Sequence, residues 1–496
     1  MIVYNIKSFS GGKSYFNDVG ITGSSKFISG AEIRGKRNSL KATQALKQEG
    51  VGIFEDLIIF FVPTPDGSIY GFGDNGRIYQ RNTNTGEWRK VYTDPHGKIK
   101  GACLYYRHHG TNDARPYLFW ATDTRLNRKA IPGKDDWSDV NEVGSGTGET
   151  YPKANLLSAN WHDMKIAQHL LLIANGNLLA GVSYEDGGYS NEVNGVPLPP
   201  SLEITSIVPR GNNELIALCS AKKKDERACL YAIDMISVDW VSRADMSFCE
   251  VDTAIDGEFF LMVAEGRLWY TDLYSKLPII DFPKGARVLP GGKAMRDNVA
   301  LFAVSNAIRT SGNQQIKASG IWAYGRNTNA STPVLDLKYP MIAEELGGLY
   351  ADTNLLLVAR KSKNDDGTFS YQVMTEDEEN KQICEYESLE LDTPFTRFPN
   401  RQRIENIIIK TVDIPKGCKV EVFYRLDLQG DFIQAHFSSV MEKQASDKEF
   451  TSGNEATFLI GAYAHTFEIK LKLTPYKNET PEVKEIYIEV GDDEDF

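Results

Sequence analysis

The chain has 496 residues, with 55 Lys and Arg against 67 Asp and Glu, which gives a formal net charge of −12. This length exceeds what one ordinary hydrophobic core supports, so we expect several domains or one large repeat array. The acidic balance argues against a basic nucleic-acid-binding surface, although it does not exclude DNA that slides past without adhering.

The composition favours strands joined by many turns, since it includes 23 Tyr, 23 Phe and 42 Gly. The N-terminus shows no basic stretch before a long apolar run, and no apolar run reaches the roughly 18 residues of a membrane-spanning helix. We therefore expect synthesis in the cytoplasm without insertion into a membrane. The cysteines are scattered without any Cys-x-x-Cys pair, which predicts small buried side chains rather than zinc modules or a disulfide framework. They are Cys103, Cys219, Cys229, Cys249, Cys384 and Cys418.

Residues 1–50 have the pattern of an irregular N-terminal extension. Ile2–Phe9 is predicted to be a strand, and repeated glycines follow it. A helix is predicted at Asn38–Gly50, because Asn38 can cap its first turn and Gly50 can end it. We expect the extension to be a docking segment for neighbouring subunits, because irregular Gly-rich segments gain order by packing against something.

The clearest structural unit is Ser68–Tyr92. Three short strands are predicted within it, at Ser68–Phe72, Arg77–Arg81 and Trp88–Tyr92, and two tight turns join them. An apolar strand, Leu57–Val62, comes before the unit. This antiparallel meander is typical of a β-propeller blade.

Looser copies of this unit recur every 40–50 residues or so across residues 51–388, which is the spacing of propeller blades. About seven units can be counted, and six or eight remain open. A single blade cannot bury both of its faces, so a closed ring is the expected solution. The alternative is a set of unrelated β-domains or one large sandwich. The later units lie at Tyr117–Arg128, Trp161–Val182, Ile204–Ile233, Thr253–Thr271, Val299–Tyr324 and Gly348–Thr375.

The period changes in residues 389–496, where a β-sandwich is predicted from closely spaced strands without any helical pattern. Within Thr466–Leu473, the apolar residues alternate with polar ones throughout. The chain ends in an acidic tail, which we expect to be solvated. The other predicted strands are Ile404–Val412, Lys419–Arg425, Phe432–Phe437, Glu455–Ile460 and Glu485–Val490.

Motifs that carry chemistry are weak in this sequence. Gly71–Gly76 matches G-x-G-x-x-G, and Gly12–Ser14 resembles the end of a phosphate-binding loop, but neither precedes a helix, so we interpret the first as a hairpin turn. His108 and His109 are adjacent, near Asp113. Adjacent side chains of an extended chain point in opposite directions, so we do not expect the two histidines to bind one metal ion. We expect His162 and His169 to pack or to form hydrogen bonds. No catalytic, cofactor-binding or metal-binding residue is assigned.

Acidic and aromatic residues in the units have structural interpretations as well. The aspartates are expected to cap turn amides, and a calcium site at Asn364–Asp366 is a minor alternative. A glycosidase would need two converging carboxylates, and no pair stands out. The aromatic residues are expected to pack within blades rather than to stack on sugars. The residues concerned are Asp66, Asp74, Asp123, Asp365, Asp366, Tyr70, Tyr79, Trp88 and Trp137.

Several stretches of the sequence, among them Ile6–Gly12, Ile69–Tyr79 and Pro415–Arg425, resemble those of β-propeller structural virion proteins of tailed bacteriophages. The resemblance spans most of the chain, and its motifs are structural rather than catalytic. It implies a part of the tail, the nozzle or a tail-associated propeller. The stretches are Ile6–Gly12, Glu32–Leu46, Ile69–Tyr79 followed by Trp88, Leu170–Asn177 followed by Leu198–Pro200 and Ile204, Pro415–Arg425 and Thr480–Val490.

The expected function is therefore that of a non-enzymatic virion component. It would form a ring-shaped homo-oligomer around the conduit used in DNA ejection. This ring would contact other tail or portal-adjacent proteins and would not bind the passing DNA specifically. The alternative is a carbohydrate-binding or glycan-degrading propeller used in host attachment. A cellular scaffold propeller would be expected to repeat Trp-Asp dipeptides, whereas Asp239-Trp240 has the reverse order.

Overall fold

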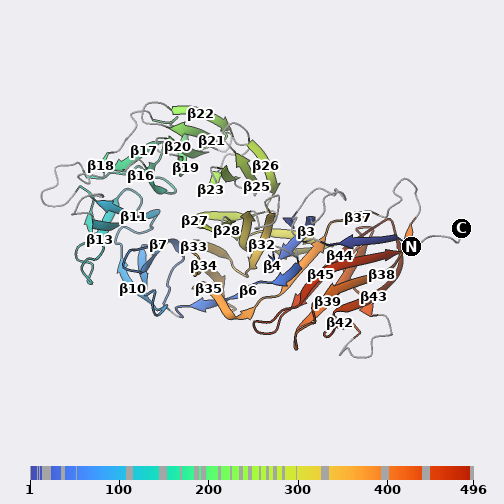
Figure 1. The fold of residues 1–496 in the computed structure, drawn as a ribbon. Helices are drawn as coiled ribbons and strands as arrows, with labels where there is room; N and C mark the ends of the chain where they lie inside the picture. The colour runs from blue at the N-terminus through green and yellow to red at the C-terminus, as the bar shows by residue number, and fades with distance from the viewer. Residues whose placement is uncertain are drawn as a thin grey trace.

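The computed structural model contains two β-units that lie side by side (Figure 1), and the described residues include no helix. One unit is a β-propeller and the other is a β-sandwich, as the sequence predicts. The described residues are 2–7, 9, 12–13, 24–34, 39–51, 53–107, 115–144, 153–167, 170–183, 189–190, 197–210, 214–223, 226–233, 238–243, 249–255, 258–263, 267–271, 276–281, 285–297, 299–325, 334–392, 401–437 and 447–491.

The propeller has seven four-stranded antiparallel blades within the described residues. Blade 1 is β7 (Ile58–Pro63), β8 (Ile69–Gly73), β9 (Arg77–Arg81) and β10 (Trp88–Thr93). Blade 2 is β11 (Gly101–Arg107), β12 (Arg115–Ala121), β13 (Leu126–Ala130) and β14 (Asn141–Glu142). Blade 3 is β15 (Met164–Ala167), β16 (Leu170–Asn175), β17 (Leu178–Val182) and β18 (Tyr189–Ser190). Blade 4 is β19 (Leu202–Arg210), β20 (Glu214–Ala221), β21 (Cys229–Ile233) and β22 (Val238–Arg243). Blade 5 is β23 (Cys249–Ile255), β24 (Glu258–Val263), β25 (Arg267–Thr271) and β26 (Lys276–Asp281).

The last two blades differ from this plain chain order. Blade 6 carries an inserted hairpin between its second and third strands, and blade 7 takes one strand from the N-terminal part of the chain. Blade 6 is β27 (Arg287–Arg296), β28 (Val299–Ser305), β31 (Gly320–Gly325) and β32 (Val334–Pro340), with the hairpin β29 (Ile308–Ser311) and β30 (Gln314–Lys317). Blade 7 is β33 (Glu345–Ala351), β34 (Leu356–Lys363), β35 (Phe369–Lys381) and β6 (Gln44–Glu49).

Strand β6 closes the ring, and the helix predicted at Asn38–Gly50 is wrong. This segment forms β5 (Ser39–Ala42) and β6 instead, and β6 pairs antiparallel with β35. Three strands of blade 7 come from its own stretch of chain, so β35 would otherwise leave a row of unpaired backbone groups at the blade edge. That tertiary pairing outweighs the local helix preference, because helix propensities of ordinary residues differ by no more than about 0.7 kcal/mol per residue.

The sandwich consists of two sheets that share one hydrophobic core. In the strand β44 (Thr466–Thr474), the alternating Phe467, Ile469, Leu471 and Leu473 are all fully buried, which confirms the predicted face. The first sheet holds β4 (Ala31–Arg34), β5, β45 (Glu482–Val490), β38 (Gln402–Thr411), β43 (Glu455–Ala464), β41 (His436–Phe437) and β1 (Ile2–Ile6). The second holds β36 (Cys384–Ser388), β44, β39 (Lys419–Leu426), β40 (Ile433–Gln434), β37 (Leu391–Asp392) and β42 (Glu449–Phe450).

The second sheet of the sandwich continues into blade 6. Strand β3 (Ser24–Ser29), with β2 (Gly12–Lys13) beside it, pairs with β36 on one side and bridges to β32 at Ser29 and Leu337 on the other. One twelve-stranded sheet therefore runs from the centre of the propeller into the sandwich. The division into 1–50, 51–388 and 389–496 is accordingly too simple, because the strands of the N-terminal 50 residues pair within both units and β36 already belongs to the sandwich.

Candidate functional site: the propeller axis and the junction

The innermost strands of the blades approach one another closely around the propeller axis. In β27, residues 289–292 form a bulge that leaves the pairing with β28. A Cβ atom on Gly291 would lie 1.8 Å from the carbonyl oxygen of Ile59 in β7, and one on Gly347 would lie 2.1 Å from that of Ile58. Only glycine permits this contact, and the bulge therefore narrows the space around the propeller axis.

A cavity of about 360 Å³ remains at the axis. Six innermost strands or the residues beside them contribute to its lining, and most of the lining residues are of apolar types, with Phe60, Val208 and Leu349 among them. Three charged residues also line it: Asp163 and Lys165 of blade 3 and Lys293 of blade 6. Apolar residues with a few polar groups among them are typical of the lining of a small-molecule site.

The charged groups at the axis form a connected series. Lys165 Nζ lies 3.8 Å from Asp163 Oδ1, and Asp163 Oδ2 accepts a hydrogen bond of 3.2 Å from Ser206 Oγ and one of 2.8 Å from the backbone N–H of Ile207. Lys293 Nζ donates to Ser206 Oγ at 3.1 Å. Burial lowers the pKa of Lys293 to about 7, and the charge of Lys165 acts in the same direction, while Asp163 opposes both.

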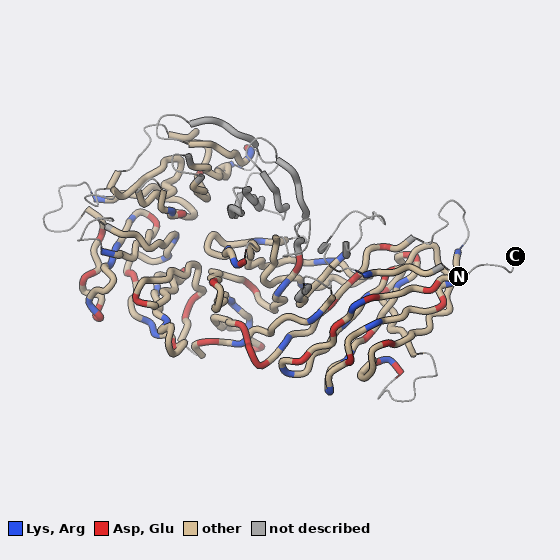
Figure 2. The backbone as a smooth tube through the Cα atoms, in the orientation of Figure 1, with Lys and Arg blue, Asp and Glu red and all other residues tan. Residues whose placement is uncertain are grey.

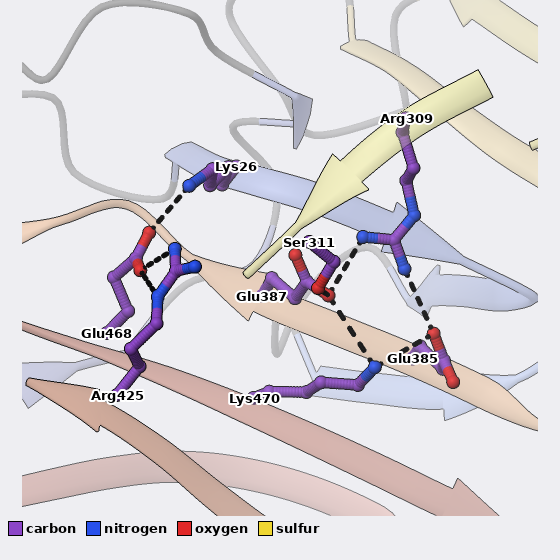
Figure 3. Close-up of polar contacts among 8 residues, drawn as sticks. All are labelled: Lys26, Arg309, Ser311, Glu385, Glu387, Arg425, Glu468 and Lys470. Atoms are coloured by element: carbon purple, nitrogen blue, oxygen red, sulfur yellow. Dashed lines mark hydrogen bonds and ion pairs between the residues drawn. The ribbon is translucent and has the colours of Figure 1, made fainter. Parts of the chain in front are cut away.

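The second candidate region is the junction of the two units, where buried ion pairs gather (Figure 3). Arg309, on the hairpin of blade 6, donates to Glu387 Oε1 at 2.9 Å and to Glu385 Oε2 at 3.2 Å. Lys470 Nζ of β44 lies 3.4 Å from Glu385 Oε2 and 3.6 Å from Glu387 Oε1. Ser311 Oγ also donates to Glu387, at 2.8 Å. Two cations and two anions therefore balance within this group.

The junction has a second buried group close by. Glu468 of β44 accepts hydrogen bonds from Arg425 of β39, and Lys26 of β3 donates to it at 2.8 Å (Figure 3). The guanidinium group of Arg309 lies 3.7 Å above the ring of Phe27 in β3. Strand β3 thus contacts charged residues of both units.

The tip of the blade 6 hairpin reaches the sandwich as well. Asn313 donates its backbone N–H to Asp431 Oδ1 at 3.1 Å, and a Cβ atom on Gly312 would lie 2.9 Å from the same carboxylate oxygen. The hairpin therefore holds the two units together at its base and at its tip, in addition to the continuous sheet. The propeller and the sandwich are therefore joined by side-chain and backbone contacts as well as by backbone pairing.

A polar groove of about 760 Å³ lies on blade 1, beside the turn that joins β9 and β10. Gln80 is central to it, because its Nε2 donates to Ser68 Oγ at 3.0 Å and its Oε1 accepts from Arg89 at 2.8 Å. Asp66 and Asn82 also line the groove. Asp66 Oδ1 accepts a hydrogen bond of 3.0 Å from the backbone N–H of Ser68, so this carboxylate oxygen is already engaged within its own turn.

The structure confirms the main interpretation of the glycine motif. Gly71–Gly76 spans the end of β8 and the tight turn into β9, and Gly76 has a positive φ of 88°. His162 is fully buried and its ring nitrogens lie 2.8 Å from Ala174 O and 3.0 Å from Asp123 O, as expected for a hydrogen-bonded histidine. The predictions for His108, His109, Asp113, His169 and Ser14 fall outside the described residues.

The predicted turn aspartates differ in their roles. Asp66 and Asp366 each accept a backbone N–H two residues ahead, which confirms local capping. Asp74 instead accepts the amide of Leu57, and Asp123 pairs with Lys100. The four aromatic residues considered for sugar stacking are all buried within blade packing: Tyr70, Tyr79, Trp88 and Trp137. Four cysteines are buried as expected: Cys219, Cys229, Cys384 and Cys418.

Sequence reasoning missed the residues that matter most at both regions. Lys293 follows Pro-Gly-Gly, a signal for a bulge that could have been noticed, whereas nothing in the sequence brings Ser206 next to it. Glu468 and Lys470 occupy the polar positions of an alternating strand, which usually face solvent. They are enclosed here because blade 6 and β3 lie against that face.

The charged residues elsewhere are distributed over both units (Figure 2). Acidic and basic residues are interspersed along the sandwich strands, and an acidic run, Glu376–Glu379, lies within β35. Among the described residues, no helix is long and apolar enough to cross a membrane.

The solved structures that resemble this chain are distant ones, and they include β-propeller domains. No family model and no curated protein matches the chain. Among solved structures, the β-propeller domain of Cps50 (Swd1) from Myceliophteria thermophila is 10% identical and matches 66% of this chain and 98% of its own, with a TM-score of 0.41. The WD40 β-propeller domain of Doa1 is 11% identical and matches 67% and 95%, with a TM-score of 0.42.

Proposed function

We propose that the protein is a non-enzymatic structural component of a tailed-phage virion, in the tail, the nozzle or a tail-associated position. The observation that carries the proposal is the junction: a twelve-stranded sheet and the buried ion pairs of Arg309 join the propeller to the sandwich. A part that transmits load between neighbours benefits from such a joint, because packed sheets deform little. The sequence phrases that resemble phage virion propellers support the same assignment.

The geometry of the axis bears on how DNA would pass. The cavity inside the ring holds about 360 Å³ and the bulge of β27 crosses beside it, so a duplex has no room within the propeller itself. In the proposed assembly, several copies surround the tail axis and the conduit lies between them. The net charge of −12 would limit adhesion of passing DNA, because an acidic wall offers few cationic contacts to phosphates.

Electron microscopy tests the proposal directly. Purified protein is imaged for symmetric ring-shaped oligomers, and particles of the phage that encodes the chain are labelled with a specific antibody and reconstructed. We expect density for the propeller and sandwich at symmetry-related positions around the tail axis. Particles that lack the chain altogether would contradict the proposal.

A glycan-binding propeller is the second candidate, and the polar groove on blade 1 favours it. The groove offers amide, carboxylate and guanidinium groups within one concave surface, and these are suitable partners for sugar hydroxyls. Glycan-array binding of the intact chain and of an Arg89→Ala variant tests this candidate. Binding that the substitution weakens supports it, and an array without any bound glycan excludes it as the explanation of host attachment.

A further inference from the structure

Two lysine side chains from different blades line the axial cavity. Lys293 comes from the strand that carries the bulge of blade 6, and Lys165 comes from β15 of blade 3. Asp163 lies between them in the hydrogen-bond series through Ser206. About a third of the Lys165 side chain is exposed, so solvent and small solutes reach the cavity.

The amine of Lys293 has the properties of a nucleophile. Its pKa is lowered to about 7, first by burial and then by the charge of Lys165, so a large fraction is the neutral amine at neutral pH. Desolvation in an apolar pocket and a neighbouring cation are the two means by which proteins activate lysine toward carbonyl compounds. Both occur here, at a group that lines a cavity.

We propose that the axial cavity is a covalent binding site for small α-keto acids, in which Lys293 forms an imine with the ketone and Lys165 binds the carboxylate. A carboxylate suits Lys165 because the ammonium group is a compact cation with three donors. The apolar side chains of Phe60, Val208 and Leu349 suit a short hydrocarbon chain.

The chemical step balances without any further reactant. The lone pair of Lys293 Nζ attacks the carbonyl carbon, a C–N bond forms, and the π electrons of the carbonyl move onto its oxygen. One proton moves from nitrogen to that oxygen and gives a carbinolamine, which then loses water as the C=N bond forms. Ser206 Oγ, 3.1 Å from Nζ and 3.2 Å from Asp163 Oδ2, is placed to pass this proton.

Reductive trapping tests the site on the full-length chain. The protein is incubated at pH 7 with pyruvate and cyanoborohydride, and modification of each lysine is followed by peptide mass spectrometry. The exposed Lys223 and Lys363 serve as internal controls. We expect saturable modification of Lys293 at a rate roughly tenfold or more above the controls, because far more of its amine is neutral.

Two variants and one analogue separate the parts of the proposal. Lys293→Met should abolish the fast, saturable trapping and leave the slow modification of the exposed lysines unchanged, with folding verified by its thermal transition. Lys165→Met should slow trapping of pyruvate at Lys293 more than trapping of ethyl pyruvate, the neutral ester with the same ketone. Modification of Lys293 at the rate of the exposed lysines overturns the imine site, and equal slowing of both compounds overturns the role of Lys165. Neither result depends on whether the chain is a virion protein.

Discussion

Arg309 of the blade 6 hairpin donates a 2.9 Å hydrogen bond to Glu387 of β36, and the two side chains are 8% and 1% exposed. This contact joins the propeller to the sandwich across 78 residues of sequence. Two charges removed from water are retained only when each is well compensated. Glu385, Lys470 and Ser311 supply that compensation, so the pair is the centre of a closed polar group rather than an isolated bond.

Removal of one partner at this joint should be strongly destabilising. We expect Glu387→Ala to lower the free energy of unfolding by about 3–5 kcal/mol, because Arg309 and Lys470 then remain in the interior with one carboxylate fewer. Urea denaturation measures the change.

A matched control for this substitution is Glu455→Ala. Glu455 pairs with Lys410 at 3.7 Å, both side chains are about half exposed, and the expected loss is below about 0.5 kcal/mol. The double variant Arg309→Met with Glu387→Met should recover much of the stability lost in Glu387→Ala, since no charge is then left uncompensated. Equal losses for Glu387→Ala and Glu455→Ala would contradict this account of the junction.

The same carboxylate predicts a dependence of stability on pH. Burial raises the pKa of Glu387, but Arg309 and Lys470 outweigh it, and the net pKa is lower than the ordinary value of 4.5. The unfolded chain therefore binds the proton first as pH falls. The stabilisation is complete well above pH 4.5 and is lost as pH falls through the lowered pKa of the folded state. Urea titrations from pH 7 to pH 3 should show a shallower acid slope in Glu387→Gln than in the wild type, and identical slopes would argue against the pairing.

Ring closure by β6 predicts a specific engineered disulfide. Lys47 and Thr375 are directly opposite in the pairing of β6 with β35. Lys47→Cys with Thr375→Cys should oxidise readily and raise the free energy of unfolding by roughly 3–5 kcal/mol, because the bond closes a very long loop. The control, Gln48→Cys with Thr375→Cys, is out of register by one residue, and its side chains face opposite sides of the blade. Cross-linking in the control pair alone would show that the register is different.

The local pattern of the sequence explains much of the fold, because alternation and turns act over a few residues. Phe467, Ile469 and Leu471 reveal a buried face without reference to any other strand, and Gly71–Gly76 reveals a hairpin. The closing strand β6 could not be found in this way, because its partner lies more than 300 residues away and its own pattern, Gln-Ala-Leu-Lys-Gln-Glu, favours a helix.

The candidate regions depend even more on distant contacts. Ser206 and Lys293 are 87 residues apart, and Lys26 and Glu468 are 442 residues apart. Each residue alone has the pattern of an ordinary strand residue, and only the closure of the ring and the continuous sheet bring them together. A low pKa for Lys293 follows from that enclosure and has no local signal.

The close approach at the axis predicts that Gly291 cannot be replaced. A Cβ atom there would lie 1.8 Å from the carbonyl oxygen of Ile59, which belongs to the backbone and cannot rotate away. We expect Gly291→Ala to lower the free energy of unfolding by about 3 kcal/mol or more, or to prevent folding. The control is Gly491→Ala, where the nearest atom, 3.0 Å away, is the flexible carboxylate of Glu405. Thermal unfolding compares the two, and a mild effect at Gly291 would mean that the bulge lies farther from β7.

Lys293→Met should stabilise the protein, and most strongly at low pH. The folded pKa of Lys293 is about 7 and the ordinary value is 10.5, so the unfolded chain binds more protons between these limits. The cost of the buried lysine is therefore complete below pH 7 and disappears as pH rises toward 10.5. We expect a gain of roughly 2 kcal/mol at pH 6 that declines by pH 10, as measured by urea denaturation. A gain that does not change with pH would show that the amine is protonated to the same extent in both states, and the site would then lack the neutral nucleophile that imine formation requires.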